Sequence, residues 1–282
     1  MTTSPEVLTA NDAACAIWRD VAPWEGQRTA AIGRFTCASA AGGSALLENA
    51  CARLAGEGFG AVLGPMDGDT WHSYRLVTES SGRPAFFLEP ANPAHFVGAF
   101  AGAGFAPVAA YVSLIDRTLA PNPEPRRIEG IKVRQWRQAE PAVELERIHA
   151  LSLAAFAGNN FYQPISLAEF ARLYQPVVPL IDPGLVLFAE TEAGECIGFL
   201  FALPDRLEGA APKTAILKTY ASRRRGVGGL LGDHFYAIVR ERGYQAVVHA
   251  LVHVDNLSLK RSQSRHGEAF RRYALFGRSL AT

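Results

Sequence analysis

A basic, glycine-rich segment between two apolar runs most constrains how this chain can fold. Residues 223–229 read Arg-Arg-Arg-Gly-Val-Gly-Gly, with an apolar run at Thr214–Tyr220 before them and a helix-like run at Leu230–Val239 after them. This order predicts a strand, a tight turn and a helix. Glycines let a ligand approach the backbone N–H groups at a helix start, where anions are favoured, and arginines add charged hydrogen bonds. The segment therefore predicts a site for a phosphorylated ligand.

Other phosphate-binding motifs fit this segment less well. The glycine spacing is not the Gly-x-Gly-x-x-Gly of dinucleotide-binding folds, and the Gly-Lys-Ser/Thr of a P-loop is absent from the chain. The alternative that remains is a plain strand-to-helix turn with solvated arginines.

The pattern Arg-x-x-Gly-x-Gly at 223–228 resembles the pyrophosphate loop of the GNAT acyltransferase superfamily, which holds acyl-coenzyme A. An apolar run at Ala246–His253, a short helix-like segment led by Asn256 and a strand-like run at Phe270–Phe276 follow in the order typical of that superfamily. The similarity covers residues 130–282 and implies an α/β (α+β) fold, a mixed central sheet flanked by helices. It implies acyl-CoA-binding positions at Thr219, Ala221, Arg223, Arg224, Arg225, Gly226, Val227, Gly228, Gly229 and Asn256.

The first half of the chain resembles the second half weakly. A strand-like run at Ala30–Cys37 leads to Gly42-Gly43 and a helix-like run at Ala45–Ala55, and two further runs continue the parallel. We expect tandem GNAT-like modules at 1–118 and 130–282, joined by a proline-rich linker at 119–129. The alternative is a chance alignment of two generic α/β segments.

The first half lacks the features that coenzyme A needs. Ser39 stands where the second half has Arg223, and no basic residue lies in 38–44. This half also lacks most of the early strands in its pattern. We expect it to bind no coenzyme A and to serve another role.

Two aromatic and polar segments are candidates for the acceptor site. One is an insertion at 64–75 that continues to Phe86–Pro90, and the other is Asn159–Pro164. Rigid aromatic groups beside hydrogen-bonding groups suit a small-molecule pocket, although a half-buried hairpin and an ordinary loop are the alternatives. The expected substrate-binding residues are Trp71, His72, Tyr74, Arg75, Asn160 and Tyr162.

The usual GNAT acid and base are missing from this sequence. The strand-like run before the loop has no carboxylate, and Gln263 stands where many GNAT enzymes have a tyrosine. The replacement candidates are His253, Tyr220 and Ser262. His249, Leu251 and His253 are expected to share one strand face because side chains repeat every two residues. For His249, a satisfied core histidine is the alternative that we favour.

Net charge, cysteine positions and the length of the apolar runs limit the kinds of partner that the sequence predicts. The net charge of +1 predicts no binding to nucleic acid or to an anionic membrane, with positive charge gathered at Arg223–Arg225 and around Arg261, Arg265, Arg271 and Arg272. The four cysteines form no metal-like cluster, and no apolar run is long enough to span a membrane, so we expect a soluble cytoplasmic protein without a metal.

The sequence therefore predicts an acyl-CoA-dependent N-acyltransferase, with acetyl-CoA as the expected cofactor and a small-molecule amine as the acceptor. The amine would attack the thioester directly. The alternatives are a non-catalytic acyl-CoA-binding protein, an interaction protein without a cofactor, and peptidyl transfer from aminoacyl-tRNA. Neither the acyl length nor the oligomeric state follows from the sequence.

Overall fold

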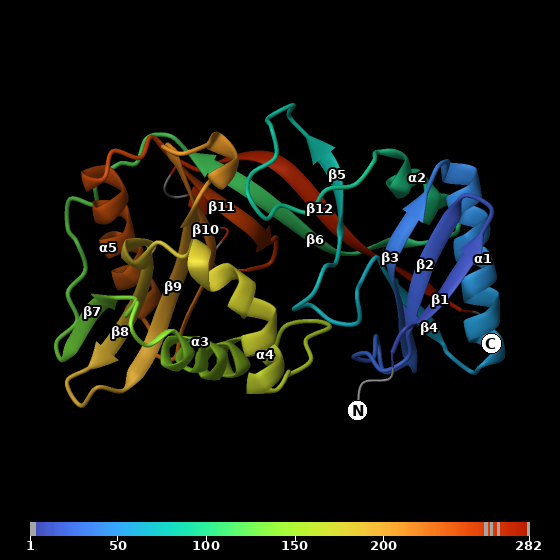
Figure 1. Ribbon diagram of the computed structural model, residues 1–282, viewed down its shortest axis with the longest axis horizontal. Helices are drawn as coiled ribbons and strands as arrows, with labels where there is room; N and C mark the ends of the chain where they lie inside the picture. The colour runs from blue at the N-terminus through green and yellow to red at the C-terminus, as the bar shows by residue number, and fades with distance from the viewer. Residues whose placement is uncertain (1–3, 257–258, 260–261, 264–265, 281–282) are drawn as a thin grey trace.

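One sheet of twelve strands runs the length of the molecule (Figure 1). The computed structural model describes residues 4–256, 259, 262–263 and 266–280, so Arg261 and Arg265 lie outside the described residues. The strand order is β1-β2-β3-β4-β12-β6-β11-β10-β9-β8-β7, with β5 paired to β12 at one side of this path. The order is not sequential at its centre, where strands from both ends of the chain meet.

The first half forms one end of the sheet, with two helices packed together on it. Its elements are β1 Glu6–Ala10, β2 Ala13–Trp18, β3 Thr29–Cys37, α1 Ala40–Gly56, β4 Ala61–Gly64, β5 Leu76–Ser80, α2 His95–Gly102 and β6 Ala106–Asp116. The expectation that this half lacks most early strands was wrong for β1 and β2, which form an antiparallel pair beside β3. Most of β1 is exposed and its sequence lacks regular apolar alternation, so the strand was not predicted. It is held by pairing with β2, by packing of Leu8 on the core and by ion pairs of Glu6.

The second half contains the strands and helices that the sequence predicts. Its elements are β7 Ile131–Gln135, α3 Pro141–Phe156, α4 Leu167–Tyr174, the 3₁₀ turns η1 Gln175–Leu180 and η2 Pro183–Leu185, β8 Val186–Thr191, β9 Cys196–Pro204, η3 Arg206–Glu208, β10 Thr214–Ser222, α5 Val227–Glu241, β11 Ala246–His253 and β12 Glu268–Ser279. Alternate residues of β8 and β9 pack toward α5 on one face and toward α3 and α4 on the other. The sheet is thus covered by helices on both faces here.

The two halves exchange their last strands. β6, from the first half, lies between β11 and β12 of the second half. β12, from the second half, lies between β6 and β4 of the first half. Figure 1 shows β6 and β12 crossing the middle of the molecule side by side. The division at 119–129 remains a prediction, and strand pairing crosses it at both of these strands.

β10 and β11 separate partway along their length. They pair in parallel only from Thr214 opposite Ala246 to Leu217 opposite His249. Beyond that point β10 continues along β9 to Ser222, whereas β11 continues along β6 to His253. The sheet is therefore split at the end of β10 that leads into the glycine-rich turn.

Candidate functional site

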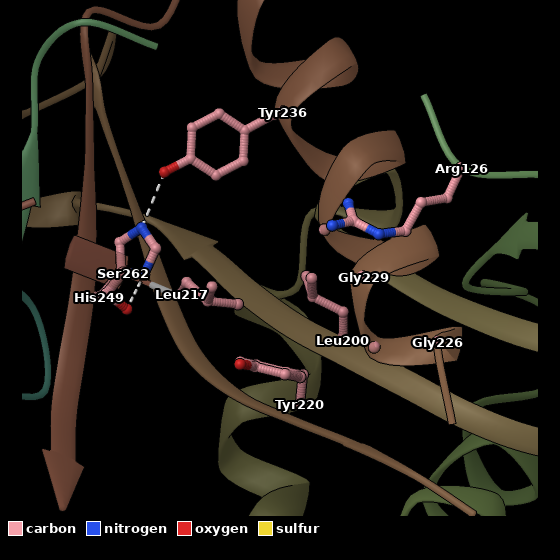
Figure 2. A pocket seen from close by; sticks show the side chains of 11 residues that line it. Arg126, Leu200, Leu217, Tyr220, Gly226, Gly229, Tyr236, His249 and Ser262 are labelled. Atoms are coloured by element: carbon pink, nitrogen blue, oxygen red, sulfur yellow. Dashed lines mark hydrogen bonds between the residues drawn. The ribbon is translucent and has the colours of Figure 1, made fainter. Parts of the chain in front are cut away.

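A cavity of about 130 Å³ lies where β10 and β11 separate, beside the start of α5 (Figure 2). Its lining comprises Arg126, Leu200, Leu217, Tyr220, Gly226, Gly228, Gly229, Gly232, Tyr236, His249 and Ser262. The cavity thus joins three glycines of the predicted phosphate loop to Tyr220 and Ser262, two of the three predicted catalytic residues. Apolar side chains from β9 and β10 form another part of its wall.

The glycine-rich turn begins α5 without a capping side chain. Gly226 has φ of +89°, a conformation that glycine adopts at little cost, and no side chain among the described residues caps the helix behind it. Val227 points into the core below the turn, while Arg224 and Arg225 are exposed above it. Arg223 donates a long hydrogen bond of 3.4 Å to the carbonyl of Ala150 on α3. The helix start is therefore open to an anion.

The linker passes over this helix start and is held there by one buried carboxylate. Asp233 of α5 accepts hydrogen bonds from the backbone N–H and the guanidinium of Arg126, at 3.0 and 2.8 Å, and from Asn122. Burial alone would raise the pKa of Asp233, but these hydrogen bonds outweigh it and the pKa is lowered. A Cβ added at Gly229 would lie 2.7 Å from Nε of Arg126. Arg126 is thus a cation at the cavity that the sequence analysis did not single out.

His249 is buried and bonded at both ring nitrogens. Its Nε2 lies 2.8 Å from the hydroxyl of Tyr236, and its Nδ1 lies 2.7 Å from the hydroxyl of Ser262. The Tyr236 hydroxyl also donates to Asp116 at 3.0 Å. This arrangement matches the core-histidine interpretation, and it places His249 on the cavity wall as well.

The prediction that His249, Leu251 and His253 share one face was wrong. The register of β11 against β6 shifts between His249 and Val252, and Leu251 has φ of +58°. Such a bulge adds one residue to β11 and reverses the alternation beyond it. His253 packs edge-on against Tyr111 at 5.0 Å and accepts a hydrogen bond from the backbone of Asp255. It is not among the residues that line the cavity.

Three further predicted cofactor positions, Thr219, Ala221 and Asn256, are not among the residues that line the cavity. Thr219 is half-buried near the end of β10, and the side chain of Ala221 is buried against the α3 face. Asn256 is exposed after β11, and its carbonyl accepts from the N–H of Leu259.

The two predicted acceptor segments contact each other across the halves. Trp71 packs at a tilt against Tyr162 at 5.7 Å and edge-on against Phe170 of α4 at 5.6 Å, and its indole N–H donates to the carbonyl of Gln163. The insertion is a hairpin-like loop closed by an isolated bridge from Met66 to Tyr74. Packing of the halves is therefore one role of this segment.

The other predicted acceptor residues make different kinds of contact. His72 bonds Asp69 at 2.9 Å, and this hydrogen bond raises the pKa of His72. Asn160 is exposed. The guanidinium of Arg75 lies over the rings of Tyr74 and Tyr111, at 3.8 and 4.1 Å. Within the described residues, the buried Nη1 of Arg75 and hydroxyl of Tyr162 have no hydrogen-bond partner.

Lys218 is a site residue that the sequence analysis did not select. It is half-buried on β10, at a bulge where the register against β9 moves from Leu217 to Thr219. Its ammonium group donates to the carbonyl of Leu88 in the insertion. Burial, together with the nearby charge of Arg75, lowers the pKa of Lys218 to about 8. The signal that could have identified it is a lone lysine within an apolar strand run.

Within the part of the chain that the structure describes, no group of three or more His, Cys, Asp or Glu side chains is placed to hold a metal ion. None of the described helices combines the length and the apolar character that crossing a bilayer requires. The four cysteines are all free.

Solved structures with a similar fold include N-acetyltransferases of the GNAT type. A GCN5-related N-acetyltransferase from Sphaerobacter thermophilus has a TM-score of 0.58 at 13% identity, over 96% of this chain and 78% of that one. A tandem GNAT protein of the clavulanic acid biosynthesis pathway has a TM-score of 0.55 at 15% identity, over 96% and 80%. A GCN5-related N-acetyltransferase from Anabaena variabilis has a TM-score of 0.55 at 10% identity, over 96% and 60%.

No protein-family model and no curated protein matches the chain. At identities this low, the structural likeness shows the fold alone, and that fold is the one expected from the sequence: GNAT-type, in two modules.

Proposed function

Because the chain has the fold of the GNAT N-acetyltransferases, in two modules, we propose that it is an acyl-CoA-dependent N-acyltransferase that acts on a small-molecule amine. One observation carries this proposal. The uncapped, glycine-rich start of α5 lines the same cavity as the parted strands β10 and β11. A ligand that combines an anionic group with a long, thin arm fits a site of this kind.

The cofactor would place its pyrophosphate on the turn that begins α5. Backbone N–H groups of this turn, those of Gly226 and Gly228 among them, would face the phosphates, with Arg224, Arg225 and Arg126 supplying positive charge. The pantetheine arm would run past Leu200 and Leu217 into the split between the strands. Acetyl is the acyl group that we expect.

The bulge in β10 would polarise the thioester carbonyl. A bulge leaves one residue of a strand outside the regular pairing, here Lys218 between Leu217 and Thr219. Its backbone N–H is a candidate donor to the carbonyl oxygen as negative charge develops there. The amine would then attack the carbonyl carbon directly, with coenzyme A as the leaving group.

The acceptor would lie between the modules. Arg75, Tyr74 and Tyr162 come from the two contacting segments, and two of them carry buried polar atoms that lack a protein partner within the described residues. A polar acceptor would satisfy these atoms, since an unpaired buried donor is costly.

Calorimetric titration with acetyl-CoA tests the cofactor assignment, with coenzyme A as a related ligand and NAD as a control. Saturable binding of the coenzyme A compounds alone supports the proposal, and absence of any binding overturns it. A panel of amines, with release of free thiol as the readout, then tests turnover.

The second candidate is a non-catalytic acyl-CoA-binding protein. It is favoured by the lack of a carboxylate on β10 and by Gln263 in place of the usual tyrosine. Tight acetyl-CoA binding without thiol release across the amine panel would favour this candidate.

A further inference from the structure

Four buried side chains form a continuous series of hydrogen bonds that ends in the cavity. Asp116 accepts from Tyr236 at 3.0 Å, Tyr236 contacts Nε2 of His249 at 2.8 Å, and Nδ1 of His249 contacts Ser262 at 2.7 Å. Figure 2 shows the last two of these contacts, with the His249 ring between the two hydroxyl groups. All four residues are buried, and three of them line the cavity.

The direction of these hydrogen bonds follows from counting protons. Tyr236 donates its single proton to a carboxyl oxygen of Asp116, so its own oxygen is left to accept. The tyrosine oxygen then accepts from Nε2–H of His249, and in the neutral imidazole this leaves the lone pair of Nδ1 to accept from Ser262. This is the pattern of a hydroxyl group, a base and an orienting group that enzymes use to move protons.

Asp116 connects this series to the other half of the molecule. It ends β6, the strand that the first half inserts beside β11. Its second oxygen accepts from the backbone of Thr118, the hydroxyl of Thr118 and the backbone of Leu119, where the linker begins. The carboxylate is therefore oriented by three hydrogen bonds in addition to the one from Tyr236.

We propose that Ser262 is the catalytic residue that carries the reaction's proton, that His249 stores this proton, and that Tyr236 and Asp116 are positioning residues that set the histidine tautomer. This inference rests on the proposed acyltransferase function. It supplies a proton path that needs neither a carboxylate on β10 nor a tyrosine at position 263. It also assigns a chemical role to the first half, which contributes Asp116.

The proton path balances without any further reactant. The amine nitrogen forms a bond to the carbonyl carbon of the thioester, and the carbon–sulfur bond breaks. A proton of the attacking nitrogen passes to Oγ of Ser262 as the serine's own proton passes to Nδ1 of His249. The imidazolium then returns that proton through Ser262 to the leaving thiolate, which yields an amide and free coenzyme A.

Kinetics of single variants test this path, with an amine from the panel as acceptor. We expect Ser262→Ala and His249→Gln to lower kcat about 100-fold, as loss of acid–base catalysis does, with acetyl-CoA affinity by calorimetry unchanged. Tyr236→Phe keeps the ring that packs in the core and should lower kcat about 10-fold through loss of tautomer control. Ser44→Ala is the matched control, since its hydroxyl donates to the Ala99 carbonyl in the first half.

Nuclear magnetic resonance of ¹⁵N-labelled histidine gives a readout that does not depend on turnover. We expect His249 to be neutral with its proton on Nε2, and Tyr236→Phe to mix the two tautomers. A resting proton on Nδ1 of wild-type His249 would overturn the proposed direction of the path.

The failures of the two proposals are distinguishable. If the wild-type protein binds acetyl-CoA but releases no thiol with any amine, the acyltransferase function fails, and the path fails with it. If turnover is present and Ser262→Ala retains it, only the path fails. If acyl groups accumulate covalently on Ser262 without amine, direct attack is wrong and Ser262 is a nucleophile instead.

Discussion

The two halves carry the same strand, turn and helix, yet only one turn is open to a ligand. In the first half β3 leads through Ser39 into α1, and in the second half β10 leads through Arg223 into α5. The Ser39 hydroxyl accepts from the N–H of Gly42 at 3.1 Å and so caps its own helix. No side chain within the described residues caps α5 in this way.

The residues around the two turns also differ in charge and in packing. A Cβ on Gly42 would lie 2.9 Å from a carboxylate oxygen of Asp12, so the first turn has an acidic neighbour. Gly43 is packed against Ala99 of α2, Phe35 and Cys37. At the second turn, the exposed arginines provide positive charge, the carboxylate of Asp233 is bonded to Arg126, and a cavity remains. The same strand, turn and helix thus form a packed, self-capped helix start at α1 and a candidate anion site at α5. The difference lies in the side chains around each helix start.

The largest expected effect comes from a carboxylate placed in the open turn. Gly228→Asp should weaken acetyl-CoA binding by about 100-fold or more, because the side chain blocks the loop and repels the phosphates. Ser39→Asp is the matched control, since aspartate is also a good cap and that turn binds nothing in our proposal. Calorimetry measures both affinities. Unchanged affinity in Gly228→Asp would place the cofactor elsewhere.

Removing charge above the turn should have a smaller effect. The double variant Arg224→Ala, Arg225→Ala is expected to weaken acetyl-CoA binding about 10-fold at low salt, and less at high salt because exposed charges are screened. Arg53→Ala on α1 removes an exposed arginine from the first half and should leave affinity unchanged. An equal loss in both proteins would show a general charge effect rather than a site.

Arg126 tests whether the linker takes part in the open turn. Arg126→Ala is expected to weaken acetyl-CoA binding about three-fold, because one charged contact at a partly exposed site contributes little. The retained backbone N–H of residue 126 still bonds Asp233. Tighter binding in this variant would instead show that Arg126 obstructs the site, a result that calorimetry would detect directly.

The smallest expected effect is on thermal stability, and it distinguishes the two strand bulges that precede the two turns. Lys218 and Arg34 each stand eight residues before the matching glycines, Gly226 and Gly42, and each lies at a register shift of its strand. Arg34 is exposed, whereas burial lowers the pKa of Lys218 to about 8. Below pH 8 the ammonium group of Lys218 is charged in both the folded and the unfolded state, and its desolvation destabilises the folded state fully. Between pH 8 and 10.5 only the unfolded state holds the proton, so stability rises with pH.

Lys218→Met should therefore raise the Tm by about 2 °C at pH 7, a modest figure since the group is only half-buried. This difference should shrink at pH 9.5. Arg34→Met should show no such pH dependence. Thermal melts at pH 7 and pH 9.5 measure the difference in Tm between each variant and the wild-type protein. An equal difference at both pH values for Lys218→Met would show that the charge of Lys218 is not involved.

The elements around the turn were readable from the sequence because their signals are local. Apolar periodicity located β10, α5 and β11, and glycine with three arginines marked the helix start. The strand β1 was not predicted because most of its residues are exposed, and its position depends on contacts with residues distant in the sequence, such as the ion pair of Glu6 with Arg53. His253 was misplaced relative to His249 because a single bulge residue, Leu251, reversed the face of the strand.

By itself, the sequence indicated the two similar halves, one turn with three arginines and one without a basic residue, and the expectation of a phosphorylated cofactor. Only the tertiary structure decided which strands meet at the centre of the sheet and which polar groups meet in the cavity. Asp116 and Tyr236 stand 120 residues apart, and their contact depends on β6 crossing into the other half. Local patterns specify elements through backbone geometry and solvent exposure, whereas such contacts depend on pairing between distant strands, which no short segment encodes.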